Sequence, residues 1–291
     1  MRYQITHITN YDYSDPVSIS HHIARVTPRD LPHQHCHSHE LDISPGASVK
    51  NERTDYFGNK VCFFSMQKAH LSLAVTAKSI VEVHSRDMPD RPVNPTWSEV
   101  RSRFQEETWS EDAAVQEFVF ASPLIPKSAE MAAYAAESFD DETPFIDCVL
   151  GLTCRIFKDF TYDSAATTVA TPLLEVWKNR RGVCQDFAHL QIACLRSLGI
   201  PARYVSGYLE TVPPPGKARL IGADASHAWL SFFCPGAGWF DVDPTNNLIP
   251  STRHVTLAWG RDFSDVSPIR GVILGGSVQV LKVSVDVAPV D

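Results

Sequence analysis

The segment RRGVCQDFAHLQIACLRSLGIPARYV (residues 180–205) contains the pattern that decides the fold. From Phe187 onward, apolar residues recur at helical spacing until a Gly-Ile-Pro sequence ends the helix. Because Gly182 precedes the helix, Cys184 is expected in or just before its first turn. A thiol there meets unpaired backbone N–H groups and the positive end of the helix dipole, which favour the thiolate and can stabilise an oxyanion. Cys184 is therefore the candidate nucleophile.

An alternative interpretation applies to Cys184 taken alone, because most cysteines are small buried apolar residues. Cys194, ten positions further on, fits that description, since its spacing places it on the core side of the helix. The seven cysteines are odd in number and form no C-x-x-C pair. This usage is typical of reduced thiols, and the chain start lacks the pattern of a signal peptide, so a cytoplasmic location is expected.

The segment DASHAWLSFFCPGAGWFDVDPTNN (residues 224–247) predicts two antiparallel strands joined by a tight turn. A turn centred on residue 235 sets His227 opposite Asp243, and a centre one residue later makes them diagonal neighbours. Since an acid beside an imidazole fixes its tautomer and stabilises the imidazolium, His227 is the candidate base and Asp243 its orienting acid. Asp241 has the same parity but lies closer to the turn. The alternative is an ordinary sheet histidine and an aspartate that only begins a turn.

The order of the remaining elements predicts an α+β fold in three parts. Residues 1–100 contain regularly spaced strand patterns, which indicate a sandwich-like all-β N-terminal domain. Residues 101–250 change from helical to strand patterns and form the catalytic core. Residues 251–291 contain the alternating run SVQVLKVSVDV, which completes the sheet or packs on the N-terminal domain. The proline-dense stretch RDMPDRPVNPTW marks the first boundary.

The composition of the chain argues against nucleic acid and membranes as binding partners. The chain has 291 residues, 44% of them hydrophobic and 21% charged, as in an ordinary globular protein. A formal charge of −8 and a pI near 5.8 argue against general affinity for nucleic acid or anionic membranes. The sequence contains no apolar run of about 18 residues, so no transmembrane helix is predicted. Neither nucleic acid nor a membrane is expected as a partner.

A histidine-rich segment, HQHCHSHE, offers a rival metal-binding interpretation. His33, His35, His37 and His39 would share one face of a strand, and imidazoles are ligands for Zn²⁺ and Ni²⁺. Alternate residues on a strand lie about 6–7 Å apart, however, which is too far for all four to reach one ion. A solvated strand face is the favoured interpretation, and no metal or cofactor is expected.

The motifs GVCQDFAHL, LGIPARYVSGYL, SHAWLSFF and GWFDVDPTNN together resemble the transglutaminase-like superfamily, and more narrowly its bacterial members often described as cysteine proteases. The opening YDYSDPVSISHHIARVTPRDLP resembles the N-terminal β domain of that group, and the tail HVTLAWGRDFSDVSPIRGVILGG resembles its C-terminal segment. The resemblance implies a papain-like core, with the nucleophile helix packed on an antiparallel sheet. By position, Cys184 matches the nucleophile, His227 the base and Asp243 the acid, four residues after Trp239 of the G-W motif.

The family chemistry implied by this resemblance is attack on a carboxamide through a thioester intermediate. The expected activity is hydrolytic, that of a cysteine protease or amidase rather than a crosslinking enzyme. A peptide or protein amide is the expected substrate, and an amine is an optional acceptor. The alternative is a catalytically silent binding module. Because the sequence has neither the calcium loop nor the zinc-binding C-x-x-C pairs of other branches, those branches are not favoured. Trp177 and Tyr162 are upstream candidates for an oxyanion partner, with no role assigned.

Overall fold

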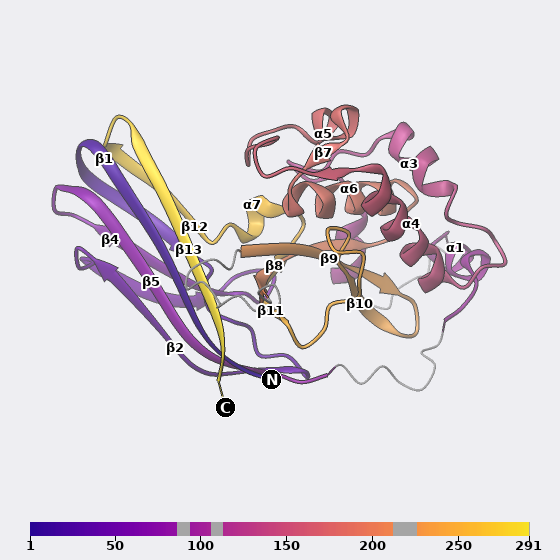
Figure 1. The fold of residues 1–291 in the computed structure, drawn as a ribbon, viewed down its shortest axis with the longest axis horizontal. Helices are drawn as coiled ribbons and strands as arrows, with labels where there is room; N and C mark the ends of the chain where they lie inside the picture. Colours follow the sequence, from indigo (N-terminus) through magenta and orange to yellow (C-terminus); the bar gives the residue numbers. More distant parts are fainter. Residues whose placement is uncertain (86–93, 106–112, 212–225, 291) are drawn as a thin grey trace, which may run out of the picture.

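A long antiparallel sheet at one end of the molecule faces a core of helices and a smaller sheet at the other (Figure 1). Both chain ends lie in the long sheet. The computed structural model describes residues 1–85, 94–105, 113–211 and 226–290. Of the proline-dense boundary stretch RDMPDRPVNPTW, the part at 86–93 therefore lies outside the described residues.

The N-terminal part is one seven-stranded antiparallel sheet built along its first strand. Its strands are β1 (Arg2–Ala24), β2 (Gln34–Ser44), β3 (Val49–Thr54), β4 (Lys60–Met66), β5 (His70–Val83), β12 (Ile269–Gly275) and β13 (Gln279–Val290). The first half of β1 pairs with β5 on one side and β13 on the other, whereas its second half pairs with β4 and β12. The C-terminal strands thus form one edge of this sheet.

A break in the pairing of β1 bends this single sheet into a half-barrel. The register between β1 and β5 shifts between Asp12 and Val17, and such irregularities bend a strand sharply. Apolar residues from β1, β2, β4 and β5, such as Val17, Phe64 and Leu73, then share one buried cluster. The predicted all-β domain is confirmed, although its first strand runs unbroken for 23 residues where several short strands were expected.

The core packs its helices around one helix and a four-stranded sheet of order β10-β9-β8-β11. The sheet strands are β8 (Ala202–Leu209), β9 (Ser226–Cys234), β10 (Gly238–Val242) and β11 (His254–Gly260). The helices are α1 (Trp97–Gln105), α2 (Ala113–Gln116), η1 (Glu117–Val119), α3 (Ala129–Ala136), α4 (Phe145–Asp159), α5 (Leu173–Asn179), α6 (Cys184–Ser197) and α7 (Phe263–Val266). A short parallel pair, β6 (Thr161–Tyr162) and β7 (Arg181–Gly182), precedes α6.

Helix α6 is the centre of the core. It begins at Cys184, and every residue from Asp186 to Arg196 is buried. Its neighbours are β8 and β9 on the sheet side and helices α3, α4 and α5 elsewhere. This arrangement confirms the predicted α+β fold with the cysteine-bearing helix packed on an antiparallel sheet. Among the helices that the structure describes, none is long and apolar enough to cross a membrane.

The two parts share one apolar core and a set of side-chain hydrogen bonds. Tyr3 and Val287 of the long sheet belong to the same buried cluster as α6. Strand β11 is an edge of the core sheet, and two amide side chains from the N-terminal part bind its backbone. Gln34 bonds both the N–H and the carbonyl of Thr256, and Asn59 does the same at Trp259. These bonds satisfy backbone groups at the edge of β11 and fix the two parts together.

Replacing Asn59 by alanine is expected to destabilise the protein. The residue is fully buried, and the substitution leaves the N–H and the carbonyl of Trp259 without these partners, at 3.0 and 2.9 Å. Losing these two bonds, together with those to Arg29 and Asp55, and leaving buried groups unsatisfied lowers the free energy of unfolding by about 2–4 kcal/mol. Urea denaturation measures this change. Asn51→Ala, on the exposed strand β3, is the control and should stay within about 0.5 kcal/mol. Equal effects of the two would contradict this account.

Candidate active site

The start of α6 holds Cys184 in a defined position. The carboxylate of Asp186 accepts hydrogen bonds from the backbone N–H of Val183 at 2.8 Å and from the Thr167 hydroxyl at 2.6 Å. It thereby caps the first turn of the helix. A Cβ atom at Gly182 would lie 2.6 Å from this carboxylate, so the position requires glycine. Burial raises the pKa of Asp186, although both hydrogen bonds act in the opposite direction. The G-V-C-Q-D motif therefore encodes the helix start.

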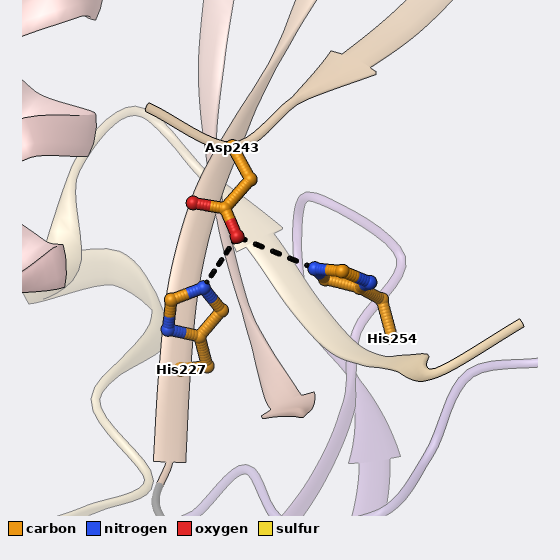
Figure 2. Close-up of side chains that lie close together, drawn as sticks. All are labelled: His227, Asp243 and His254. Atoms are coloured by element: carbon orange, nitrogen blue, oxygen red, sulfur yellow. Dashed lines mark hydrogen bonds and ion pairs between the residues drawn. The ribbon is translucent and has the colours of Figure 1, made fainter. Parts of the chain in front are cut away.

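His227 and Asp243 come from the sheet that faces this helix. The Nε2 atom of His227 lies 2.8 Å from Oδ2 of Asp243 (Figure 2). Gly238 pairs with Cys234, which centres the turn on Gly236. Asp243, just beyond the end of β10, is consequently the diagonal neighbour of His227 rather than its direct partner. The second of the two predicted registers is the one that forms.

The structure also brings Cys184 to His227. The Cys184 thiol lies close enough to His227 to raise the pKa of the imidazole, and because Nε2 is committed to Asp243, Nδ1 is the nitrogen left to face the thiol. Burial alone would lower the pKa of His227, but the interactions with Asp243 and Cys184 outweigh it and raise the pKa to about 10. The imidazole is therefore protonated at neutral pH, where its charge stabilises an adjacent thiolate.

The Asp243 carboxylate is fully buried and saturated with donors. Its Oδ1 atom accepts from the backbone N–H groups of Thr245 and Asn246, which forms an Asx turn. Its Oδ2 atom accepts from His227 and from the Asn246 amide at 2.7 Å, and His254 Nε2 lies 3.3 Å away (Figure 2). Burial opposes ionisation, but these bonds hold the pKa of Asp243 well below its usual range. Asp243 thus uses Oδ1 to hold the turn and Oδ2 to orient His227.

His254 is a site residue that the sequence did not indicate. Its Nδ1 atom accepts a hydrogen bond from the backbone N–H of Ser251 at 3.3 Å, so Nε2 carries the proton and donates to Asp243. The residue begins β11, which is separated from β9 by β8, and no local pattern links it to the hairpin. Asn246, in contrast, had a signal, because the D-P-T-N-N sequence is typical of an Asx turn.

His227, Asp243 and His254 also form the one group that could hold a metal ion among the residues described. Each offers a ligand atom, and these atoms lie within 4.8 Å of one another. All three residues are buried, and hydrogen bonds already connect their ligand atoms. Protons shared in these bonds account for the close approach, so the donor set serves to hold His227 rather than to demand an ion.

Of the other site residues suggested by the sequence, Asp241 and Trp177 have structural partners, whereas Tyr162 lies beside Cys184. Asp241 accepts hydrogen bonds from Trp229 and Ser231, whereas the carboxylate that bonds His227 is that of Asp243. The Trp177 indole donates to Glu130, so it has a structural partner. Tyr162 pairs with Gly182 in the short parallel sheet, and its pKa is raised first by burial and then by the nearby Cys184. Of the two upstream aromatics, Tyr162 is the one beside the thiol.

The histidine-rich segment does not form a common face, so that expectation is wrong. A register shift between Cys36 and Ser38 changes the parity of β2, and His35 and His39 therefore lie on opposite faces. Each has its own partner: His35 pairs with Asp30 at 3.1 Å, and His39 bonds the Ser79 hydroxyl at 2.9 Å. Within the described part of the chain, these histidines do not converge on a metal position.

The raised pKa of His227 predicts a specific pH dependence of stability. A group whose pKa is about 10 when folded and about 6.5 when unfolded stabilises the fold fully below pH 6.5, and this contribution disappears as the pH rises to 10. Unfolding midpoints of the native protein should therefore fall more steeply across this range than those of His227→Gln. Thermal denaturation at several pH values measures both profiles. Parallel profiles would show that His227 is not stabilised in its charged form.

The fold and the site together define a class of protein in which a cysteine at a helix start faces a His–Asp pair on a sheet. Residues 3–82 match the family model of the bacterial transglutaminase-like N-terminal region, and residues 132–244 match that of the transglutaminase-like superfamily. An uncharacterized protein of Mycobacterium tuberculosis is 40% identical over 99% of this chain and 93% of its own length. The chain therefore belongs to the bacterial transglutaminase-like superfamily proteins.

Two further similarities concern structure and a shared segment. The crystal structure of a "putative cysteine protease" from Cytophaga hutchinsonii superposes with a TM-score of 0.75. It is 22% identical and covers 100% of this chain and 92% of that one, which establishes a common fold. A protein-glutamine gamma-glutamyltransferase of Pseudomonas aeruginosa is 31% identical over 107 residues, which are 34% of this chain and 16% of that protein.

Proposed function

We propose that the protein is a cysteine amidase or protease that cleaves amide bonds through a thioester on Cys184. The observation that carries this proposal is the series from thiol to imidazole to carboxylate, in which His227 is hydrogen-bonded to Asp243 at 2.8 Å and has Cys184 close enough to raise its pKa. The same residue types occur in the same roles in other thiol enzymes. The half-buried Cys184 also lies at the start of a 14-residue helix, where the dipole favours a thiolate.

The proposed reaction has two balanced stages. The Cys184 thiolate attacks the carbonyl carbon, and a C–S bond forms while the C–N bond breaks. The departing nitrogen takes the proton of the His227 imidazolium and leaves as ammonia or an amine. Water then attacks the thioester, His227 accepts one of its protons, and the C–S bond breaks to release the acid and restore the thiolate. Asp243 holds the imidazole in one orientation throughout.

Backbone geometry supplies a place for the developing oxyanion. The first N–H groups of α6 have no partner within the helix, and the one at Cys184 lies next to the attacking sulfur. Tyr162 lies beside Gly182, two residues before the thiol, and is about half exposed. A phenolic O–H at this point is a suitable second donor to the oxyanion.

Water is the proposed acceptor because it needs no binding site of its own, and two of the described cavities near the site hold no free acid for an amine. One cavity is lined by Gln185, Asp186 and His189 of α6 together with residues of α5 and nearby loops. Its described carboxylate, Asp186, is already hydrogen-bonded within the helix start. The other cavity contains no carboxylate among its described lining residues. An ammonium acceptor would thus gain no ion pair in these two cavities. A third cavity does contain carboxylates, Asp163 and Glu175, but Arg181 lies among them and pairs with Asp163 at 3.8 Å.

Detection of the thioester tests this proposal. The protein is mixed with acetylated peptide amides, quenched in acid and examined by intact-mass spectrometry, with release of ammonia followed in parallel. The proposal expects an acyl adduct on Cys184 that hydroxylamine removes, and ammonia release without an added amine. A requirement for added amine would favour crosslinking. The absence of both adduct and ammonia across peptide and glutamine amides would support the alternative, a silent binding module.

A further inference from the structure

A cavity of about 410 Å³ lies where the long N-terminal sheet meets the core. We call it the junction pocket; its sheet wall consists of His7, Thr9, Tyr11, Leu281, Val283 and Val285. The size falls within the range of about 300–1,000 Å³ that ligand pockets occupy. In Figure 1, β13 lies on the side of the long sheet nearer α7, with its partner β1 beside it.

The wall is a regular ladder of cross-strand neighbours. On β1 and β13, His7 pairs with Val285 and Thr9 pairs with Val283, and one step further Tyr11 pairs with Leu281. Paired residues share a face of the sheet. Closer to the chain ends, the same face is buried in the shared core. At Val283 and Leu281 the cover ends, and these side chains are 52% and 53% exposed. The pocket is therefore a continuation of an apolar face that no residue within the described ranges covers at this point.

The pocket is electrically neutral at physiological pH. Burial lowers the pKa of His7 to about 4, so this imidazole is uncharged. Its two nitrogens are satisfied by the Tyr208 hydroxyl at 2.8 Å and by the Thr9 hydroxyl at 3.0 Å. None of the other described lining residues is ionisable near neutral pH. Apolar groups gain from burial here, whereas a charged group would lose hydration without gaining a partner.

The opposite wall of the pocket borders the candidate active site. It includes Ser226, the residue immediately before His227 at the start of β9. It also includes Phe263, whose ring packs against Tyr204 at 6.3 Å between centroids and whose backbone N–H donates to His189 of α6. Burial first, and the nearby Cys184 second, raise the pKa of Tyr204, so the Tyr204 side chain connects this wall of the pocket to the thiol.

We infer that the junction pocket binds an aromatic or branched aliphatic side chain of the substrate, next to the carboxamide that Cys184 attacks. The inference rests on the proposed function and adds a substrate class to it: peptides with a large apolar residue at the reacting carbonyl. It also gives the N-terminal sheet a role, because β1 and β13 supply half of the pocket. Polar amides, including that of glutamine, are expected to bind more weakly.

Binding to Cys184→Ala measures the pocket without any chemistry. Calorimetric titration compares N-acetylphenylalaninamide with N-acetylglutaminamide, and the first is expected to bind at least tenfold more tightly. Val283→Asp should remove this preference. Val280→Asp is the matched control, since Val280 lies on the same strand, is 51% exposed and points to the opposite face. Val283→Trp, which fills the cavity without adding charge, should weaken binding of the aromatic probe equally, with Val280→Trp as its control.

If only the Val283 variants lose the preference for the aromatic probe over the glutamine probe, the inference is supported. Equal probe affinities in the parent, or equal effects of the Val283 and Val280 substitutions, would overturn it. Thioester formation by the unmodified protein is scored separately. If the thioester forms but the preference is absent, the junction pocket inference fails alone; if the preference is present but no thioester forms, only the proposed chemistry fails.

Discussion

Replacement of Cys184 by alanine is expected to yield a folded protein without amide-bond turnover. The side chain is half-buried at the first position of α6, and the helix keeps its Asp186 cap, so the fold loses little. Removing the attacking atom forces the reaction through water, and losses on the order of 10³–10⁶ in kcat accompany such changes in other enzymes. Ammonia release from peptide amides gives the rate, and a thermal melt gives the stability.

The control for this variant is Cys154→Ala. Cys154 is also half-buried and lies on α4, outside the candidate site. Its substitution should leave the rate within about twofold, since surface changes away from a site have small effects. If Cys184→Ala turned over substrate as fast as Cys154→Ala, the nucleophile would have to be another group.

Asp243→Asn is expected to have the second largest effect, lowering kcat by about 10³–10⁴. The substitution preserves shape but removes the negative charge that holds the proton of His227 at Nε2. The pKa of His227, now about 10, should fall toward its ordinary value, because burial, the largest opposing influence, remains. The imidazolium, and with it the stabilised thiolate, would then persist only under more acidic conditions.

Asp241→Asn separates this effect from general damage. Asp241 lies two residues before Asp243 in the same hairpin, where it pairs with Ser231. Its carboxylate accepts hydrogen bonds from Trp229 and Ser231. The titration of His227, followed by NMR, should shift downward in Asp243→Asn and stay near about 10 in Asp241→Asn. The same downward shift in both variants would mean that the carboxylate of Asp243 is not the particular group that orients His227.

The sequence predicted the parts of the site that depend on local patterns. The helix start at Cys184 follows from glycine and apolar spacing, and the hairpin follows from its turn residues. Whether Asp243 lies directly opposite His227 or diagonal to it depended on the position of the turn, and two registers remained open. The structure places the turn at Gly236, a single-residue distinction that glycine-rich turns do not determine from sequence.

Features that depend on tertiary pairing were missed. His254 reaches Asp243 because β8 and β11 pair far along the chain, and no spacing rule connects them. The bend of β1 and the parity change in β2 both come from local register shifts, which alternation patterns do not reveal. The junction pocket likewise arises only when β13 returns to pair with β1.

Selective alkylation tests most directly whether Cys184 is an activated thiolate, as the proposed reaction requires. Brief treatment with iodoacetamide at about pH 6, followed by peptide mapping, labels thiolates, whereas ordinary thiols with a pKa near 8.5 react little. Cys36 and Cys154 are half-buried, as Cys184 is, and therefore serve as internal controls for the effect of exposure on labelling. We predict that only Cys184 is labelled fast in the native protein, and that its labelling is much slower in His227→Gln. Equal slow labelling of all three cysteines would contradict it.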